Sequence, residues 1–332
     1  MRLIYVKSHL EWSEDSLCIY FAHEKTDHTE SKPGNPRHIY ANPYRPEICP
    51  IVSLGIYFLY VDVTNPEGQY IFARQKQGCR FDKVLIQWLP EGEQGQVNRG
   101  RGGRGGRGRG ADGGSRGEEL EQQASQLAGV SRRRYGTHSI RKGSSTYASS
   151  CTTSCPSYVS ICNRAGWSLG IPGLYLQYEA AGDQYLGRTL AGLNGNDTSF
   201  AVLPPQFKEG YEDIVTRLVR EHFSFYDSVG SVMQKVVRMT MASVVYHMDA
   251  IKLWNSCTEL WKKPLFTRDY GVRLKDIVEV REWTAGDVRN VTGIPPHICT
   301  ALETKRLRVA AEDILKTYVR SEGSSVIQGR GI

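Results

Sequence analysis

A tract made only of arginine and glycine interrupts this chain, from Arg99 to Gly110. Neither residue offers apolar surface to bury, so we expect the tract to be disordered, within an insertion over about residues 91–117. The fold must therefore be built from the two flanking segments. Such tracts bind RNA or single-stranded DNA through charge and guanidinium stacking, but they also occur as solvated surface loops, and both interpretations stay open. The arginines of the tract are Arg99, Arg101, Arg104, Arg107 and Arg109.

The composition indicates a soluble protein with a polyanionic partner. The chain has 332 residues, which suits about two domains, and a formal net charge of +7, which favours nucleic acid. The eight cysteines include no Cys-x-x-Cys pair, so we expect ordinary thiols rather than metal ligands. We also expect no cofactor. The longest apolar run, Ile48–Val63, contains Pro50 and is too short to span a bilayer, and no secretory signal precedes it. We expect a reduced intracellular protein, nuclear if its substrate is chromosomal DNA.

The segment before the tract has a mixed pattern of strands and helices. Residues 16–22 are rich in β-branched and aromatic side chains, which predicts a strand, and residues 37–41 are expected to form the returning strand. Pro46 then opens a predicted helix that runs to about Val61, since proline is tolerated in a first helical turn. A second short helix is expected over residues 80–88.

The segment after the tract is predicted to be mainly helical. Thr137 is placed to cap its first helix and Gly182 to end its third. Helices are expected over residues 137–149, 156–165, 173–180, 209–225, 229–246, 247–262 and 301–320, with a less regular patch around Trp283. The residues expected on one side of the last helix, to pack on the domain or on a partner, are Leu307, Ala310, Ile314 and Val319.

These elements predict a mainly α protein with a small antiparallel β-sheet, an α+β fold. We expect two regions. The first, residues 1–190, carries the candidate chemistry and is interrupted by the insertion. The second, residues 191–332, is helical and ends in the long polar helix.

Residues suited to cutting a DNA backbone follow one another downstream of the tract. His138 and Arg141 are three residues apart, so on a helix they share one face and can bind one phosphate together. Trp167 has an indole N–H that can donate to the same phosphate. Tyr175 or Tyr178 can then supply the attacking oxygen. The order and spacing predict cleavage by a tyrosine nucleophile.

The chemistry explains why these residue types belong together. Tyrosine has a pKa near 10, so it attacks only when a neighbour takes its proton or a positive site stabilises the phenolate. Arginine binds two oxygens of the crowded phosphate at once, and each well-placed donor contributes about 3 kcal/mol in the transition state. Lys25, in the predicted turn between the two early strands, can protonate the leaving 5′ oxygen. Lys142, beside Arg141, adds a cation for nucleic acid.

Each of these residues also has an ordinary alternative. A His-x-x-Arg pair is expected about once by chance in a chain this rich in arginine. A tryptophan after glycine is more often a core residue, and a lone lysine is more often a solvated turn residue. With 18 tyrosines in the chain, one in any given window is unsurprising. Only the combination supports the functional interpretation.

A competing motif overlaps this set. Residues 166–170 match Gly-x-Ser-x-Gly, the nucleophile elbow of serine hydrolases, with Ser168 as nucleophile and residues 158–162 as the strand before it. His222, His247 and His297 are available downstream. The downstream half is predicted to be helical, however, so the elbow lacks the sheet that it needs. We rank this hypothesis below the first.

Longer stretches of the chain resemble one family, the tyrosine recombinases of Crypton-type eukaryotic transposons. The resemblance covers most of the chain outside the Arg/Gly insertion and is far more specific than any single motif. The matching stretches are residues 9–12, 21–27, 38–43, 46–50, 137–143, 164–170, 175–183, 201–205 and 293–297.

The resemblance implies a mainly helical catalytic domain that transfers a DNA phosphodiester to tyrosine. It assigns Tyr175 as the nucleophile, with Tyr178 as the second candidate because Tyr175 lies eight residues after Trp167, where nine is usual. It places Lys25 on a hairpin, and it gives His138, Arg141 and Trp167 their places around the phosphate. It also implies DNA integration through a 3′-phosphotyrosyl intermediate, by a homo-oligomer on DNA.

The chain departs from the family at its N-terminal end. The family's first catalytic arginine is expected further upstream of His9 than this chain extends, and Arg2 lies too close to Trp12 to replace it. Losing one phosphate-binding arginine costs about 3 kcal/mol in the transition state, enough to abolish useful turnover. The resemblance therefore predicts a truncated or decaying element product. A catalytically dead nucleic-acid binder derived from a transposon is the leading alternative.

Overall fold

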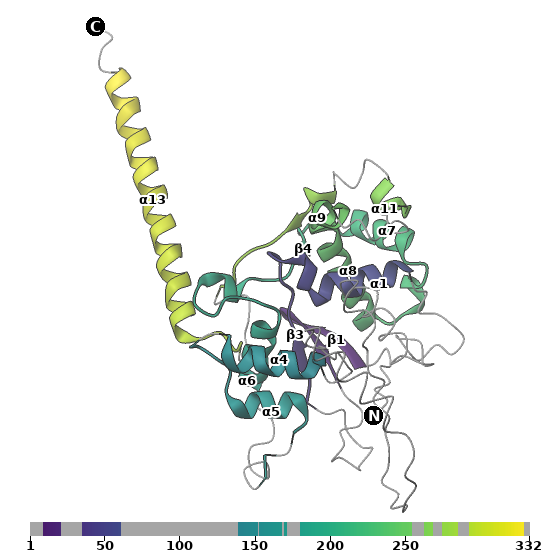
Figure 1. Ribbon diagram of the computed structural model, residues 1–332. Helices are drawn as coiled ribbons and strands as arrows, with labels where there is room; N and C mark the ends of the chain where they lie inside the picture. The colour runs from purple at the N-terminus through teal and green to yellow at the C-terminus, as the bar shows by residue number, and fades with distance from the viewer. Residues whose placement is uncertain are drawn as a thin grey trace, which may run out of the picture. The chain divides into compact units, whose positions relative to one another are not determined.

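The structure is a computed structural model that describes residues 9–20, 35–60, 139–151, 153–167, 169–170, 180–253, 262–267, 274–284 and 292–328. These residues are mainly helical with a small antiparallel sheet, so the predicted α+β class is confirmed at that level (Figure 1). The chain divides into two compact units, residues 1–72 with 147–332 and residues 73–146. The Arg/Gly insertion and the helix predicted at 80–88 lie outside the described residues.

Three short strands form the larger of two small sheets described in this unit, in the order β1-β2-β3 with antiparallel neighbours. β2 (Ser16–Ile19) and β3 (Arg37–Ile39) occupy the places of the two predicted strands. β1 (Leu10–Ser13) was not predicted. A tight turn joins β1 to β2, with Glu14 in the left-handed region at φ 48°. The segment that contains Lys25 therefore connects two paired strands, β2 and β3.

The main core lies between helices from opposite ends of the chain. α1 (Pro50–Tyr60) packs on α8 (Ser231–Tyr246), and β1 packs on the same helix. α7 (Glu212–His222) contributes an apolar stripe at helical spacing to this core, formed by Val215, Leu218 and Val219. Elements from both sides of residue 190 contribute to this core, and the two regions expected from the sequence stay a prediction.

Helices α5 and α6 lie beside the sheet. α5 (Tyr158–Ala165) begins at Ser157, whose side chain accepts a hydrogen bond from the backbone N–H of Ser160. α6 (Ala180–Leu190) packs on α5 and on β3. The helix stop predicted at Gly182 is wrong, because α6 continues through this residue for more than another two turns. α4 (Ser139–Ser150) matches the helix predicted at 137–149, and its Ala148 packs on α5 and α6.

A second, smaller core cluster lies around Phe200 and fixes the base of the last helix. α13 (Pro296–Gln328) contains the predicted helix 301–320 and is longer at both ends (Figure 1). Its Ile298 and Leu302 are buried in this cluster. The remaining elements are η2 (Pro46–Ile48), η5 (Thr198–Ala201), β4 (Gln206–Phe207), η6 (Tyr226–Ser228), α9 (Met248–Lys252), α11 (Pro264–Thr267) and β5 (Val278–Glu279).

Candidate functional site

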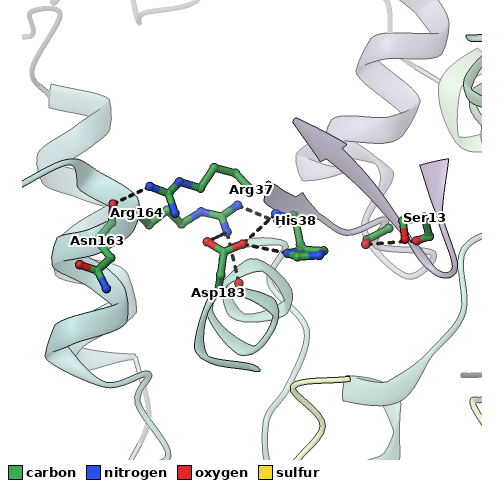
Figure 2. A network of polar contacts seen from close by, with 7 residues as sticks. Ser13, Arg37, His38, Asn163, Arg164 and Asp183 are labelled. Carbon is green, nitrogen blue, oxygen red and sulfur yellow. Dashed lines mark hydrogen bonds and ion pairs between the residues drawn. The ribbon is translucent and has the colours of Figure 1, made fainter. Parts of the chain in front are cut away.

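A buried carboxylate, Asp183, joins three elements of the larger unit (Figure 2). Asp183 lies in the first turn of α6. Its Oδ2 accepts hydrogen bonds from the backbone N–H of His38 at 2.8 Å and from His38 Nδ1 at 3.1 Å. Its Oδ1 accepts one from Arg164 Nη1 at 2.8 Å. Asp183 thus links β3, which carries His38, to α5, which carries Arg164.

The same residues are also tied through their backbones. Arg164 Nη2 donates to the carbonyl of His38 at 2.8 Å, and Arg37 Nη2 donates to the carbonyl of Asn163 at 2.9 Å. Burial alone would raise the pKa of Asp183, but the hydrogen bonds from His38 and the charge of Arg164 lower that pKa below its ordinary value. The carboxylate is therefore ionised at neutral pH, and both of its oxygens already accept hydrogen bonds from protein groups, which is typical of a positioning group.

A second buried charge follows one and a half turns later on α6. Arg188 is fully buried, and its Nη2 donates to Asp15 in the β1–β2 turn. Its Nη1 donates to the carbonyl of Phe200 at 3.0 Å, and its guanidinium carbon lies 4.2 Å from the centre of the Tyr40 ring. Both ends of α6 are thus fastened to the sheet and its connections by charged side chains.

Trp167 lies just beyond this network. Gly166 ends α5 in the left-handed conformation at φ 65°, and the N–H of Trp167 donates to the carbonyl of Cys162 at 2.9 Å. The Trp167 side chain is 40% exposed. Since Arg164 is three residues earlier, the network fixes the helix end from which Trp167 projects.

The other predicted site residues are described only in part. Arg141 and Lys142 lie on α4, and both side chains are exposed. Lys25, His138, Tyr175 and Tyr178 lie outside the described residues, as do the arginines of the tract. Their proposed roles stay predictions.

The nucleophile elbow of the hydrolase hypothesis is contradicted at its first element. The motif needs a strand before the nucleophile. Residues 158–162, expected to form that strand, belong to helix α5 instead. The physical reason is local, because Ser157 caps a helix here and Gly166 ends it. Ser168 itself lies outside the described residues.

A cavity of about 370 Å³ opens between α5, α6 and residues 292–295. Its polar side chains already have partners. The hydroxyls of Ser157 and Ser160 lie 2.7 Å apart, and the Tyr185 hydroxyl donates to the carbonyl of Ser154. Thr292 Oγ1 accepts from the N–H of Ile294 at 3.1 Å. The polar side chains of the cavity carry no charge and are paired with one another or with the backbone, so we do not place the chemistry in this cavity.

The described residues contain no cluster of three or more His, Cys, Asp or Glu side chains that could hold a metal ion. No described helix is both long enough and apolar enough to cross a bilayer. Comparisons with protein-family models, curated proteins and solved structures gave no significant match.

Sequence reasoning gave no role to the residues of the buried network. His38, Arg164 and Asp183 all lie within the stretches that resemble the recombinase family. Their contact was not predictable from spacing, because His38 and Asp183 are 145 residues apart. No local signal marks Asp183 either, because the sequence predicts the end of a helix at Gly182, directly before it.

Proposed function

We propose that this chain cleaves and rejoins DNA strands through a 3′-phosphotyrosyl intermediate, as the catalytic domain of a Crypton-type tyrosine recombinase. It would act as a homo-oligomer on chromosomal DNA in the nucleus. The single observation that carries the proposal furthest is the buried network at Asp183, because its members bracket the candidate catalytic residues along the chain.

The bracketing can be followed residue by residue. Trp167 comes three residues after Arg164, and Tyr175 and Tyr178 come eight and five residues before Asp183. Arg164 and Asp183 are in direct contact, with 2.8 Å between Nη1 and Oδ1. The two ends of the segment that bears the candidate phenols are therefore held side by side, which limits where a tyrosine in that segment can reach.

The third member of the network extends the argument to the lysine. His38 lies on β3 and binds both Asp183 and Arg164. β3 pairs with β2, and the connection between these strands contains Lys25. Three candidate groups, the indole, the phenol and the ammonium, thus belong to chain segments that are anchored at one carboxylate. Such anchoring supports the proposal, because transfer of a phosphoryl group requires that its catalytic groups be held in place.

The proposed reaction assigns one role to each group. The phenol of Tyr175, or of Tyr178, loses its proton and its oxygen attacks the phosphorus. The bond from phosphorus to the 5′ oxygen breaks, and Lys25 gives a proton to that oxygen. His138, Arg141 and Trp167 stabilise the negative charge on the phosphate oxygens. Attack by the 5′ hydroxyl of another strand reverses these steps and releases the tyrosine, so no external energy source is consumed.

A nicked suicide substrate tests the proposal. The substrate is a pool of duplexes of random sequence with a nick in the labelled strand. After cleavage beside the nick, the short fragment with the 5′ hydroxyl diffuses away and the strands cannot be rejoined. The covalent complex of the protein with the labelled strand is thus trapped and is detected on a denaturing gel. We expect trapping by the wild-type chain and its loss in Tyr175→Phe, or in Tyr178→Phe if that residue is the nucleophile. Tyr158→Phe is the matched control, because Tyr158 is 70% exposed and lies outside the candidate set.

Two results would overturn the proposal, the first against strand cleavage itself and the second against the assigned nucleophiles. One is binding of the same duplexes without any trapped product, which would instead indicate a nucleic-acid binder without catalysis. The other is trapping that persists when both Tyr175 and Tyr178 are replaced by phenylalanine.

A further inference from the structure

Beyond its base, helix α13 lies outside the packed core of its unit. Ile298 and Leu302 hold its first turns in the core. An ion pair at the surface, with 2.8 Å between Lys305 Nζ and Glu282 Oε1, also connects the helix to its unit. From Glu303 to Arg320 every side chain is exposed. Helices in proteins owe most of their stability to a packed apolar face, so five exposed turns suggest that this helix has a partner.

The exposed part of α13 carries an apolar stripe with coiled-coil spacing. Leu307, Ala311, Ile314 and Tyr318 recur at intervals of four, three and four residues. The side chains of Leu307, Ile314 and Tyr318 are 59%, 70% and 59% exposed. Ala310 and Leu315 border the stripe. The charged residues away from it are Lys305, Arg306, Glu312, Asp313, Lys316 and Arg320. Val319, predicted to share the face of Ile314, is five residues further on and therefore lies off the stripe.

The charges beside the stripe favour a particular partner. In a heptad with Ala311 at position a and Ile314 at position d, Glu303 occupies g and Arg308 occupies the following e. In a parallel pair of helices, position g faces the next e of the partner, so Glu303 of each copy would meet Arg308 of the other. An antiparallel pair would place g beside g and e beside e, which offers neither residue an opposite charge on the other helix; within its own helix Glu303 Oε1 lies 3.6 Å from Arg306 Nη2.

We propose that α13 pairs with the same helix of a second copy as a parallel two-stranded coiled coil. Ala311 and Ile314 form its central layers, Leu307 and Tyr318 its outer layers, and Ala310 packs on Leu315 of the other helix. The stripe covers little more than two heptads, so the association depends on concentration. The proposal uses only α13 and is independent of any catalytic activity.

Sedimentation of the full chain without DNA, over a range of concentrations, tests the pairing. We expect a monomer–dimer equilibrium that Ile314→Glu abolishes. Val309→Glu is the matched control, because it introduces the same charge at an exposed apolar residue of the opposite face, where Val309 is 52% exposed. That variant should dimerise as the wild type does. Both positions are exposed, so neither change should unfold the protein.

A cysteine placed in the stripe tests the orientation. In a parallel pair the two copies of residue 311 face each other, so Ala311→Cys should form a dimer linked by a disulfide under mild oxidation. Val309→Cys, on the outer face, should give no more linked dimer than the native cysteines do. A wild-type chain that stays monomeric at every concentration overturns the proposal, as does a dimer that Ile314→Glu leaves intact. Dimerisation without a link at residue 311 overturns the parallel arrangement.

Discussion

The Asp183 carboxylate accepts hydrogen bonds from β3 and from α5, and the charges around it determine whether it is protonated. Burial opposes the ionised form, but His38 and Arg164 more than compensate, so the pKa of Asp183 lies below its ordinary value. None of these three side chains is exposed. A group so enclosed cannot contact DNA, so under the proposed function Asp183 would act only by holding β3, α5 and α6 together.

Replacing this carboxylate should be costly. Asp183→Asn leaves the Arg164 guanidinium buried without its opposite charge, and we expect a loss of about 3–5 kcal/mol in the free energy of unfolding, measured by urea denaturation. Asp227→Asn is the matched control. Its ion pair with Arg220 is well exposed, so we expect a change of about 1 kcal/mol or less. A loss in Asp183→Asn as small as that in Asp227→Asn would show that the network contributes little to stability.

The wild-type chain should show the same contribution in its pH dependence. The folded-state pKa of Asp183 is lowered, so its contribution is fully present above the ordinary aspartate pKa of about 4 and is lost as the pH falls below that value. Asp183→Asn should remove this part of the acid sensitivity. An unchanged slope of stability against pH below about 4 would contradict the assignment.

Elements were predicted best where the pattern is local. β-branched and aromatic residues indicated the place of β2, with β3 as its returning strand, and Pro46 indicated that of α1. Helices α5, α7 and α8 lie close to their predicted ranges. Gly182 was misread as a stop because glycine often ends helices. In the folded chain Gly182 precedes Asp183, and the contacts of that carboxylate with β3 and α5 hold the first turn of α6. Only tertiary contacts distinguish a glycine that ends a helix from one that lies inside it.

The packing of α1 on α8 gives a test at the same scale. A Cβ added at Gly55 would lie 2.6 Å from Val244 Cγ2 and 2.7 Å from the carbonyl oxygen of Thr240, closer than packed atoms approach. Gly55→Ala should therefore force the helices apart and destabilise the fold by about 1–3 kcal/mol, measured by thermal or urea unfolding.

The matched control for this change is Gly143→Ala on α4, where an added Cβ meets nothing within 4 Å. There the usual preference of helices for alanine should stabilise the protein by up to about 1 kcal/mol. The two substitutions are chemically identical, so opposite signs are the expected result. A stabilising Gly55→Ala would show that α1 and α8 do not approach so closely.

At the scale of the whole molecule, the sequence indicated the fold class but not which distant segments share a core. Leu10 and Trp12 are buried in the same cluster as Val236 and Met241, although more than 200 residues separate them. No pattern within either segment indicates this pairing, because an apolar residue is equally suited to any core.

The net charge of +7 gives the last prediction, because a large share of the arginine is concentrated in one tract. If Arg99, Arg101, Arg104, Arg107 and Arg109 each contact a phosphate of single-stranded DNA or RNA, they release counterions. Changing all five to glutamine should then reduce the slope of log affinity against log salt by roughly 3 to 4. Titrations of a labelled single strand at several salt concentrations measure that slope.

The same five positions changed to lysine separate charge from stacking. Lysine keeps the charge, so the salt slope should stay near that of the wild type, while affinity falls because the planar guanidinium can no longer stack on bases. A tract that is only a solvated loop would behave differently, since neither set of changes would then alter affinity or slope. A slope that falls equally in both sets would mean that the arginine geometry, rather than its charge, determines phosphate contact.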